Sequence, residues 1–214
     1  MTVVKNPRPL YLPNTHPEFM NILLITAHPN AKDSFTAALT ARYVTLAQES
    51  EHDLFVMDLY DSQWQQEYFT FDSAHHPDFA RTQRRIQEKI TWADELVFVH
   101  PLWWGSPPAV LKNWLDANLT SGFAFAHDKQ RPDWVSRFWP LPSHRLLKPK
   151  TGKVFVTGDG PFWTYLLLGL PFLLIWGFSV FFYTGIRPRS LRYFGAMRLR
   201  SRESLERLLH SVRL

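Results

Sequence analysis

Short apolar runs alternate along the chain with longer segments in which apolar residues recur at helical spacing. A short apolar run is typical of a buried parallel strand, whereas apolar positions three and four residues apart indicate a helix with one buried face. The pattern predicts five strands, at residues 21–26, 53–58, 96–99, 153–157 and 190–194. It predicts helices at residues 35–48 and 80–93, from Pro108 onward, within 162–186 and from Ser201 onward. This alternation predicts an α/β fold with a parallel sheet.

The segment 97–119 carries the clearest local signal in the chain. It runs from an apolar strand through an aromatic loop, HPLWWG at residues 100–105, into an amphipathic helix. Loops at the carboxyl ends of parallel strands are where open α/β sheets bind ligands. Trp103 and Trp104 lie in such a loop, where a core residue would not normally be placed. They therefore indicate a planar, ring-bearing cofactor.

Two helix starts are also signalled. Pro108 suits the first position of the helix that follows the aromatic loop. Ser34 follows the polar loop at residues 27–33 and suits the N-cap of the next helix. Because this helix start follows a strand directly, its unpaired backbone N–H groups favour a phosphate. Ser34 is thus either a cap alone or a cap that also contacts an anion.

Residues 162–186, FWTYLLLGLPFLLIWGFSVFFYTGI, carry no charge. Their length satisfies the test for a membrane span. Gly169, Pro171 and Gly177 interrupt the segment, and a span would leave one face of the sheet uncovered. We expect a buried helix at a homodimer interface. A surface that touches a membrane and a span remain as alternatives.

Composition narrows the chemistry. The chain of 214 residues has no cysteine, which excludes disulfides, thiolate metal sites and a cysteine nucleophile. His75 and His76 are expected to be solvated, so no metal site is predicted. The formal charge of +5 suits an anionic partner such as a phosphate-bearing cofactor or an acidic membrane surface. Nucleic acid is not expected, because the basic residues form no recognisable binding motif with exposed aromatics.

The chain is expected to contain one domain and one arm. Residues 1–20 are rich in proline and lack an apolar run, so we expect a flexible arm outside the fold. Residues 21–214 are sufficient for a single domain with a full core.

The motif PLWWGSPPAVLKNW at residues 101–114 resembles the signature PLxWWxxPAxLKxW of the flavodoxin-like NAD(P)H:quinone oxidoreductases. This family includes animal quinone reductases, bacterial drug-activity modulators and the ancillary flavoproteins of glutathione-gated potassium efflux systems. AHP at residues 27–29 with SFT at 34–36 is similar to the family's first flavin-phosphate loop, and GFAF at 122–125 is similar to a loop that borders its pocket. The resemblance implies a five-stranded parallel sheet in the order 2-1-3-4-5, with helices on both faces, and a flavin-binding domain at residues 21–214.

The same resemblance implies a set of site residues. Those implied for cofactor binding are His28, Ser34, Phe35 and Thr36 at the phosphates, Pro101, Leu102, Trp103, Trp104 and Gly105 at the ring, and Thr157, Gly158, Asp159 and Gly160 at its polar edge. Tyr165 lies near the position of the family's catalytic tyrosine, and Phe125 and His127 fall at the substrate pocket. Asp159 departs from the family pattern, in which a small residue is common.

The function implied is that of a flavoprotein enzyme, with FMN or FAD, which takes a hydride from NAD(P)H and passes two electrons to a quinone or a similar acceptor. The alternative is a regulatory flavoprotein partner of a membrane potassium efflux system. We expect a homodimer in the cytoplasm. Peripheral contact with the inner face of the membrane or with a transporter is left open.

Overall fold

The computed structural model describes residues 19–214 except 31, 129–131, 133–137 and 139–140. The predicted arm at residues 1–20 therefore lies almost wholly outside the described residues. Most of the segment between residues 129 and 140 lies outside them as well.

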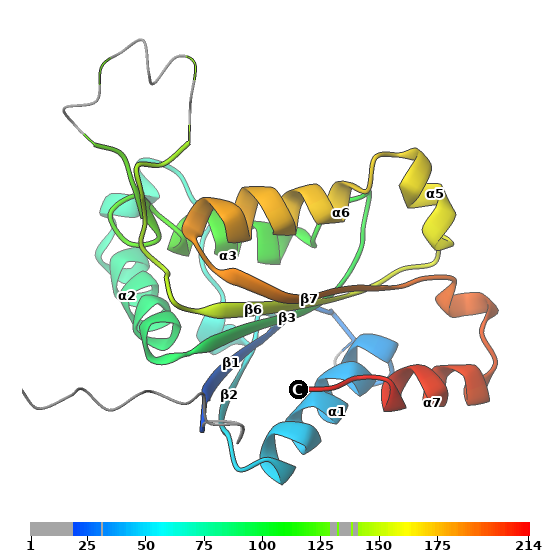
Figure 1. Cartoon of the computed structure of the whole chain (residues 1–214). Coiled ribbons are helices and arrows are strands. Elements are labelled where there is room, and N and C mark those ends of the chain that lie inside the picture. The colour runs from blue at the N-terminus through cyan, green and yellow to red at the C-terminus, as the bar shows by residue number, and fades with distance from the viewer. Residues whose placement is uncertain (1–18, 31, 129–131, 133–137, 139–140) are drawn as a thin grey trace, which may run out of the picture.

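A five-stranded parallel sheet forms the centre of the molecule (Figure 1). Its strand order, β2-β1-β3-β6-β7, is the predicted order 2-1-3-4-5 with two short strands inserted in the numbering. The strands are β1 (Asn21–Thr26), β2 (Asp53–Asp58), β3 (Glu95–Pro101), β6 (Thr151–Thr157) and β7 (Arg187–Phe194). The two short strands, β4 (Phe125–Ala126) and β5 (His144–Arg145), pair antiparallel outside this sheet and were not expected.

Helices cover both faces of the sheet, as predicted (Figure 1). On one face α1 (Phe35–Glu49) and α7 (Arg202–His210) pack over a core that includes Leu24, Val97 and Phe155. The other face is covered by α2 (Pro77–Trp92), α3 (Ala109–Asn118), α6 (Pro171–Leu173) and the π-helical segment η3 (Leu174–Phe182). Alternate strand residues point to opposite faces, so neighbouring positions in a strand belong to two separate cores.

Several strand and helix ends differ from the predictions. β3 extends to Pro101, so His100 belongs to the strand and is buried. Pro108 is the N-cap of α3 and lies one residue before the helix. β6 and β7 each begin before the predicted start, because edge and end residues with polar side chains still pair through their backbones. The segment between β2 and α2, for which no regular structure was predicted, contains the short 3₁₀ helices η1 (Ser62–Trp64) and η2 (Ser73–His75).

The apolar segment 162–186 is not one helix. It contains α5 (Phe162–Leu167), α6 and η3. A turn in which Gly169 and Leu170 have φ of 76° and 50° separates α5 from α6, and η3 follows α6 directly. Pro171 then begins the next helix, a position in which its missing N–H costs nothing. Trp176 and Phe181 of η3 are buried, whereas α5 is largely exposed. Within the described ranges, no helix has both the length and the apolar character needed to cross a membrane.

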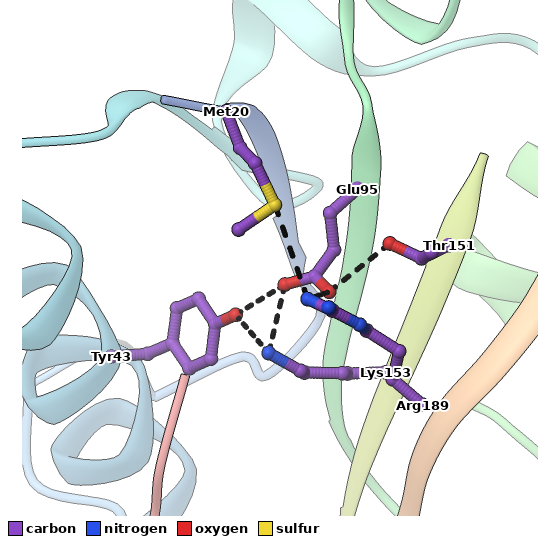
Figure 2. A network of polar contacts seen from close by, with 6 residues as sticks. All are labelled: Met20, Tyr43, Glu95, Thr151, Lys153 and Arg189. Carbon is purple, nitrogen blue, oxygen red and sulfur yellow. Dashed lines mark hydrogen bonds and ion pairs between the residues drawn. The ribbon is translucent and has the colours of Figure 1, made fainter. Parts of the chain in front are cut away.

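A buried polar network lies at the amino-terminal edge of the sheet (Figure 2). Glu95 is fully buried and forms an ion pair of 2.9 Å with Lys153. Tyr43 donates a hydrogen bond of 2.7 Å to the same carboxylate. The network also includes Thr151, Arg189 and Met20. It ties β3, β6, β7 and α1 together at the edge opposite to the predicted site.

Candidate functional site

Three loops meet at the carboxyl edge of the sheet. They follow β1, β3 and β6, whose parallel pairing places their carboxyl ends side by side. The Thr36 hydroxyl at the start of α1 lies 3.0 Å from the Thr157 hydroxyl at the end of β6, and both side chains are buried. The Leu102 N–H donates to the Thr157 carbonyl at 2.7 Å. The cofactor-binding residues predicted from three separate segments are therefore brought together.

The amino end of α1 forms the first part of this edge. Ser34 is the N-cap, as predicted: its hydroxyl accepts from the Ala37 N–H at 3.1 Å and donates to the Asn30 carbonyl at 2.8 Å. The His28 ring accepts from the Asn30 N–H at 3.0 Å, which stabilises the loop. Phe35 packs edge to face on Phe194. The first N–H groups of the helix have no acceptor within it and carry partial positive charge, which suits a phosphate.

The two tryptophans lie in a tight turn. The Trp103 and Ser106 backbones exchange two hydrogen bonds of 2.9 Å. Trp104 and Gly105 between them have φ of 51° and 75°, the left-handed geometry of a type I′ turn. A tryptophan is rarely found in this conformation, and strain of this kind often occurs at ligand sites. The Trp104 side chain is fully exposed and that of Trp103 is 44% exposed, so neither is core packing.

The chain that follows β7 holds the loop after β6 by backbone hydrogen bonds. The Gly158 carbonyl accepts from the Met197 N–H, and the Gly160 carbonyl accepts from the Ala196 N–H. The N–H groups of Asp159 and Gly160 have no acceptor in the described part of the chain, so they remain as donors to a ligand. Asp159 is exposed and forms an ion pair of 2.9 Å with Arg198. Its negative charge is therefore compensated by a neighbour.

Tyr165 on α5 lies beside this loop. A Cβ atom at Gly160 would lie 3.0 Å from the Tyr165 ring. Tyr165 also packs edge to face on Tyr193, with ring centroids 5.0 Å apart. Tyr193 lies at the end of β7 and donates to the Gly160 carbonyl at 2.6 Å. Burial raises the pKa of Tyr193, and the neighbouring Tyr165 raises it further.

A buried histidine lies directly behind the aromatic turn. The Nε2 atom of His100 accepts from the Trp176 indole N–H at 3.0 Å, and Nδ1 lies 2.8 Å from the Pro101 carbonyl. These contacts fix a neutral ring with the proton on Nδ1. Burial lowers the pKa of His100 to about 4, although the hydrogen bond to Pro101 opposes this shift. The end of β3 is thus tied to η3 without a charge.

The two residues predicted for the substrate pocket lie apart from these loops. Phe125 lines a cavity of about 690 Å³ between α3 and η3, whose wall also includes Ser106 and Leu115. His127 contacts Tyr183, the residue directly after η3, with 3.3 Å between the ring nitrogen and the hydroxyl. The cavity begins next to the aromatic turn at Ser106, yet neither the turn's tip nor the loop after β6 lines it. We assign the candidate cofactor site to the three loops, because they carry the free backbone N–H donors. The cavity is a separate groove.

Comparison with known proteins agrees with this architecture. A family model described as "Flavodoxin-like fold" matches residues 20–210. The chain belongs to this flavodoxin-like family. A ribosyldihydronicotinamide dehydrogenase-like protein from Penicillium crustosum is 32% identical over 143 residues, which cover 56% of this chain and 51% of the relative. The ancillary protein KefG of the glutathione-regulated potassium-efflux system of Enterobacter is 36% identical over 103 residues, which cover 48% of this chain and 47% of KefG. The chain thus spans about half the length of the curated relatives it matches.

A solved structure extends the similarity across the fold. A putative quinone reductase from Klebsiella pneumoniae is 26% identical and superimposes with a TM-score of 0.74, covering 89% of this chain and 81% of the other. The loops of this flavodoxin-like chain fit a flavin on their own chemistry: helix N–H groups for phosphate, exposed indoles for a ring, and loop N–H groups for a polar edge. These groups come from the residues predicted at the carboxyl edge.

Three residues at this edge were not among the predicted site residues. Tyr193, Trp176 and Arg198 contact Gly160, His100 and Asp159 respectively. Each lies more than 30 positions from its partner in the chain, so no local spacing marks the contact. A partial signal exists for Tyr193, because the last residues of a strand in the predicted order must lie beside the loop after the neighbouring strand.

Proposed function

We propose that this protein binds a flavin, FMN or FAD, at the carboxyl edge of its sheet and reduces a quinone or a similar acceptor with NAD(P)H. The observation that carries the proposal is the convergence of the amino end of α1, the turn at Trp104 and the loop after β6, held by the contact between Thr36 and Thr157. A bound flavin supplies two-electron transfer by hydride. In the overall reaction NAD(P)H, a proton and the quinone give NAD(P)⁺ and the quinol.

The residues at the edge have separate roles in this proposal. The N–H groups at the start of α1, with His28 and Ser34 beside them, hold the phosphates. Trp103 and Trp104 position the ring, and the N–H groups of Asp159 and Gly160 bind its polar edge. The ion pair with Arg198 keeps the Asp159 carboxylate from repelling an electron-rich reduced ring.

Tyr165 is our candidate for the residue that gives a proton to the reduced acceptor. It lies next to Gly160 and contacts the Tyr193 ring, which orients it. Tyr165→Phe is expected to lower kcat by roughly 10²-fold, the lower part of the range for general acid catalysis, with little change in flavin binding. An unchanged kcat would remove Tyr165 from the mechanism. Phe125, which lines the groove, and His127, which contacts Tyr183, stay as proposed substrate contacts.

The relatives support this assignment by their names. One is a ribosyldihydronicotinamide dehydrogenase-like protein, and a solved structure of the same fold is a putative quinone reductase. We further propose a homodimer, in which the groove between α3 and η3 is available to a second copy. A position in the cytoplasm or at the inner face of the membrane fits a need for NAD(P)H.

The first experiment is an absorption spectrum of the purified protein in the near-ultraviolet and visible range. Oxidised flavin bands are expected, which bleach on addition of NADPH and return when a quinone is added. Trp103→Ala with Trp104→Ala is expected to reduce flavin occupancy, whereas Trp92→Ala, a change of a partly exposed tryptophan on α2, is the matched control. A colourless protein that binds neither FMN nor FAD would refute the proposal.

The similarity to KefG favours a second candidate function. In this function, the flavin-bound protein binds to a membrane potassium efflux system and regulates it. This function predicts co-purification with an efflux transporter and a change in potassium efflux when the paired tryptophans are replaced. Flavin turnover with quinone but no effect on efflux would leave the enzymatic function alone.

A further inference from the structure

The Tyr193 hydroxyl contacts the backbone of the loop after β6. It donates a hydrogen bond of 2.6 Å to the Gly160 carbonyl. The Ala196 N–H donates to the same carbonyl at 3.2 Å, and the Met197 N–H donates to the Gly158 carbonyl at 3.2 Å. Tyr193 therefore adds a side-chain bond, shorter than these backbone bonds, to a loop that carries the proposed polar-edge donors.

Two glycines leave room for this hydroxyl. A Cβ atom at Gly158 would lie 2.5 Å from the Tyr193 hydroxyl, and a Cβ atom at Gly195 would lie 2.6 Å from the Tyr193 ring. Neither glycine has a positive φ. Space, rather than a special backbone conformation, therefore requires glycine at both positions. The loop and the end of β7 are matched to a tyrosine that lies directly against the backbone.

The Tyr193 ring is packed among aromatic side chains from α5 and α6. Its centroid lies 5.0 Å from that of Tyr165, 5.4 Å from that of Phe172 and 6.4 Å from that of Phe162. Burial raises the pKa of the Tyr193 hydroxyl, and the neighbouring Tyr165 and Asp159 raise it further, so the hydroxyl remains a donor at and above neutral pH. The ring is thus held by packing, and the hydroxyl is free to serve the loop.

The bonds to the loop carbonyls fix where the loop N–H groups point. A peptide group is planar and trans, so each N–H points away from the carbonyl of the preceding residue. The Gly158 carbonyl points towards the start of η4 (Met197–Leu199), and the Asp159 N–H therefore points to the opposite side. The Gly160 carbonyl is fixed in turn by the tyrosine hydroxyl. The loop therefore has little freedom to rotate the N–H groups of Asp159 and Gly160.

We propose that Tyr193 is a positioning residue for the flavin, an inference that rests on the proposed function. Its hydroxyl holds the Gly160 carbonyl and so keeps the N–H groups of Asp159 and Gly160 aligned on the polar edge of the ring. Hydrogen bonds to an acceptor with negative charge are stronger than bonds to a neutral one, so these donors bind the electron-rich reduced flavin more tightly than the oxidised one. Tyr193 therefore raises the reduction potential of the bound flavin.

The test compares Tyr193→Phe with the wild type, because this change removes the hydroxyl and keeps the packed ring. Flavin titration and a spectroscopic redox titration against a reference dye are the measurements. The variant is expected to bind oxidised flavin roughly fivefold more weakly, within the range for one neutral hydrogen bond. The loss for reduced flavin is expected to be about fivefold larger again, which lowers the midpoint potential by about 20 mV for a two-electron couple. Loss of fold stability alone would leave this potential unchanged.

Tyr43→Phe is the matched control. It removes a buried tyrosine hydroxyl that donates to Glu95 at the opposite edge of the sheet. This control is expected to destabilise the fold and to keep the wild-type flavin affinity and potential. Gly158→Ala is a second test variant, because its Cβ atom would displace the Tyr193 hydroxyl. It is expected to lower the potential in the wild type and to have a smaller effect in the Tyr193→Phe background, where no hydroxyl remains to be displaced.

The outcomes separate this inference from the proposed function. If NADPH reduces the wild-type flavin, a quinone reoxidises it and Tyr193→Phe keeps the wild-type potential, this inference is wrong and the proposed function stands. A wild type that binds neither FMN nor FAD refutes the proposed function and this inference with it. An equal fall in potential in Tyr43→Phe would show that general loosening of the fold sets the potential, which would also overturn the role of Tyr193.

Discussion

His100 is a buried residue whose charge is controlled by the fold. The unfolded chain takes up a proton on this ring as the pH falls below its ordinary pKa of 6.5, but the folded protein does so only near pH 4. Stability therefore falls as the pH falls through this window, and it falls no further once both states are protonated. Between about pH 7 and about pH 5 the loss from this residue is about 2 kcal/mol.

The measurement is urea unfolding of the wild type and of His100→Gln at both pH values. The glutamine keeps a neutral, hydrogen-bonding side chain next to Trp176 but does not titrate. Its unfolding free energy is expected to decrease by about 2 kcal/mol less than that of the wild type over the same interval. All other titrating groups are common to both proteins, so equal losses would show that His100 is already protonated in the fold or stays neutral in the unfolded chain.

At the scale of elements, the left-handed turn at Trp104 lowers the stability of the fold and holds an exposed indole ring. Asparagine adopts left-handed geometry more readily than tryptophan, so Trp104→Asn is expected to raise the unfolding free energy by up to about 1 kcal/mol. The same change removes an aromatic surface and is expected to weaken flavin binding roughly tenfold. Urea unfolding of the flavin-free protein and a flavin titration measure the two effects.

Trp104→Ala serves as the control for the turn. It removes the ring but keeps a side chain that disfavours positive φ, so it is expected to weaken flavin binding without a gain in stability. If the asparagine variant were less stable than the wild type, the strain at this turn would be compensated by contacts of the indole, and the interpretation of the turn would be wrong.

The same elements show what the sequence can predict. β1 and β2 were placed correctly, and the cap at Ser34 was found, because apolar runs and capping residues act over a few neighbouring positions. The division of residues 162–186 into α5 and a second helical segment, α6 with η3, was not predicted. Nearly every side chain there is apolar, so no polar face marks where α5 ends and η3 begins. Gly169 and Pro171 indicated that the segment is interrupted, but they did not indicate that α5 would be exposed.

Contacts between distant segments set a further limit at the site. The bond between Trp176 and His100 joins residues 76 positions apart, and that between Thr36 and Thr157 joins residues 121 apart. Neither follows from local spacing, since both depend on the strand order and on the exact register of the sheet. The loops of the candidate site were predicted from their places after strands and from the family resemblance, whereas the side chains that position them required the structure.

At the scale of the whole molecule, stability and the proposed function are located at opposite edges of one sheet. The network at Glu95 (Figure 2) lies at the amino-terminal edge, and the proposed flavin site lies at the carboxyl edge. Glu95 and Lys153 are both buried, so each compensates a charge that would be costly alone. Burial lowers the pKa of Lys153, and the nearby Glu95 carboxylate opposes that shift. Loss of one partner should therefore affect the whole fold but not the site.

Glu95→Gln is expected to lower the unfolding free energy by about 3 kcal/mol or more, because the Lys153 ammonium is left buried without its partner. The double change with Lys153→Met removes both charges, and its loss is expected to be smaller than the sum of the two single losses. Urea unfolding of the four proteins gives this coupling directly. Flavin affinity, measured by titration on the same samples below the unfolding transition, is expected to stay at the wild-type value in all of them. Additive losses would show that the pair is not coupled, and a fall in flavin affinity would show that the two edges of the sheet are not independent.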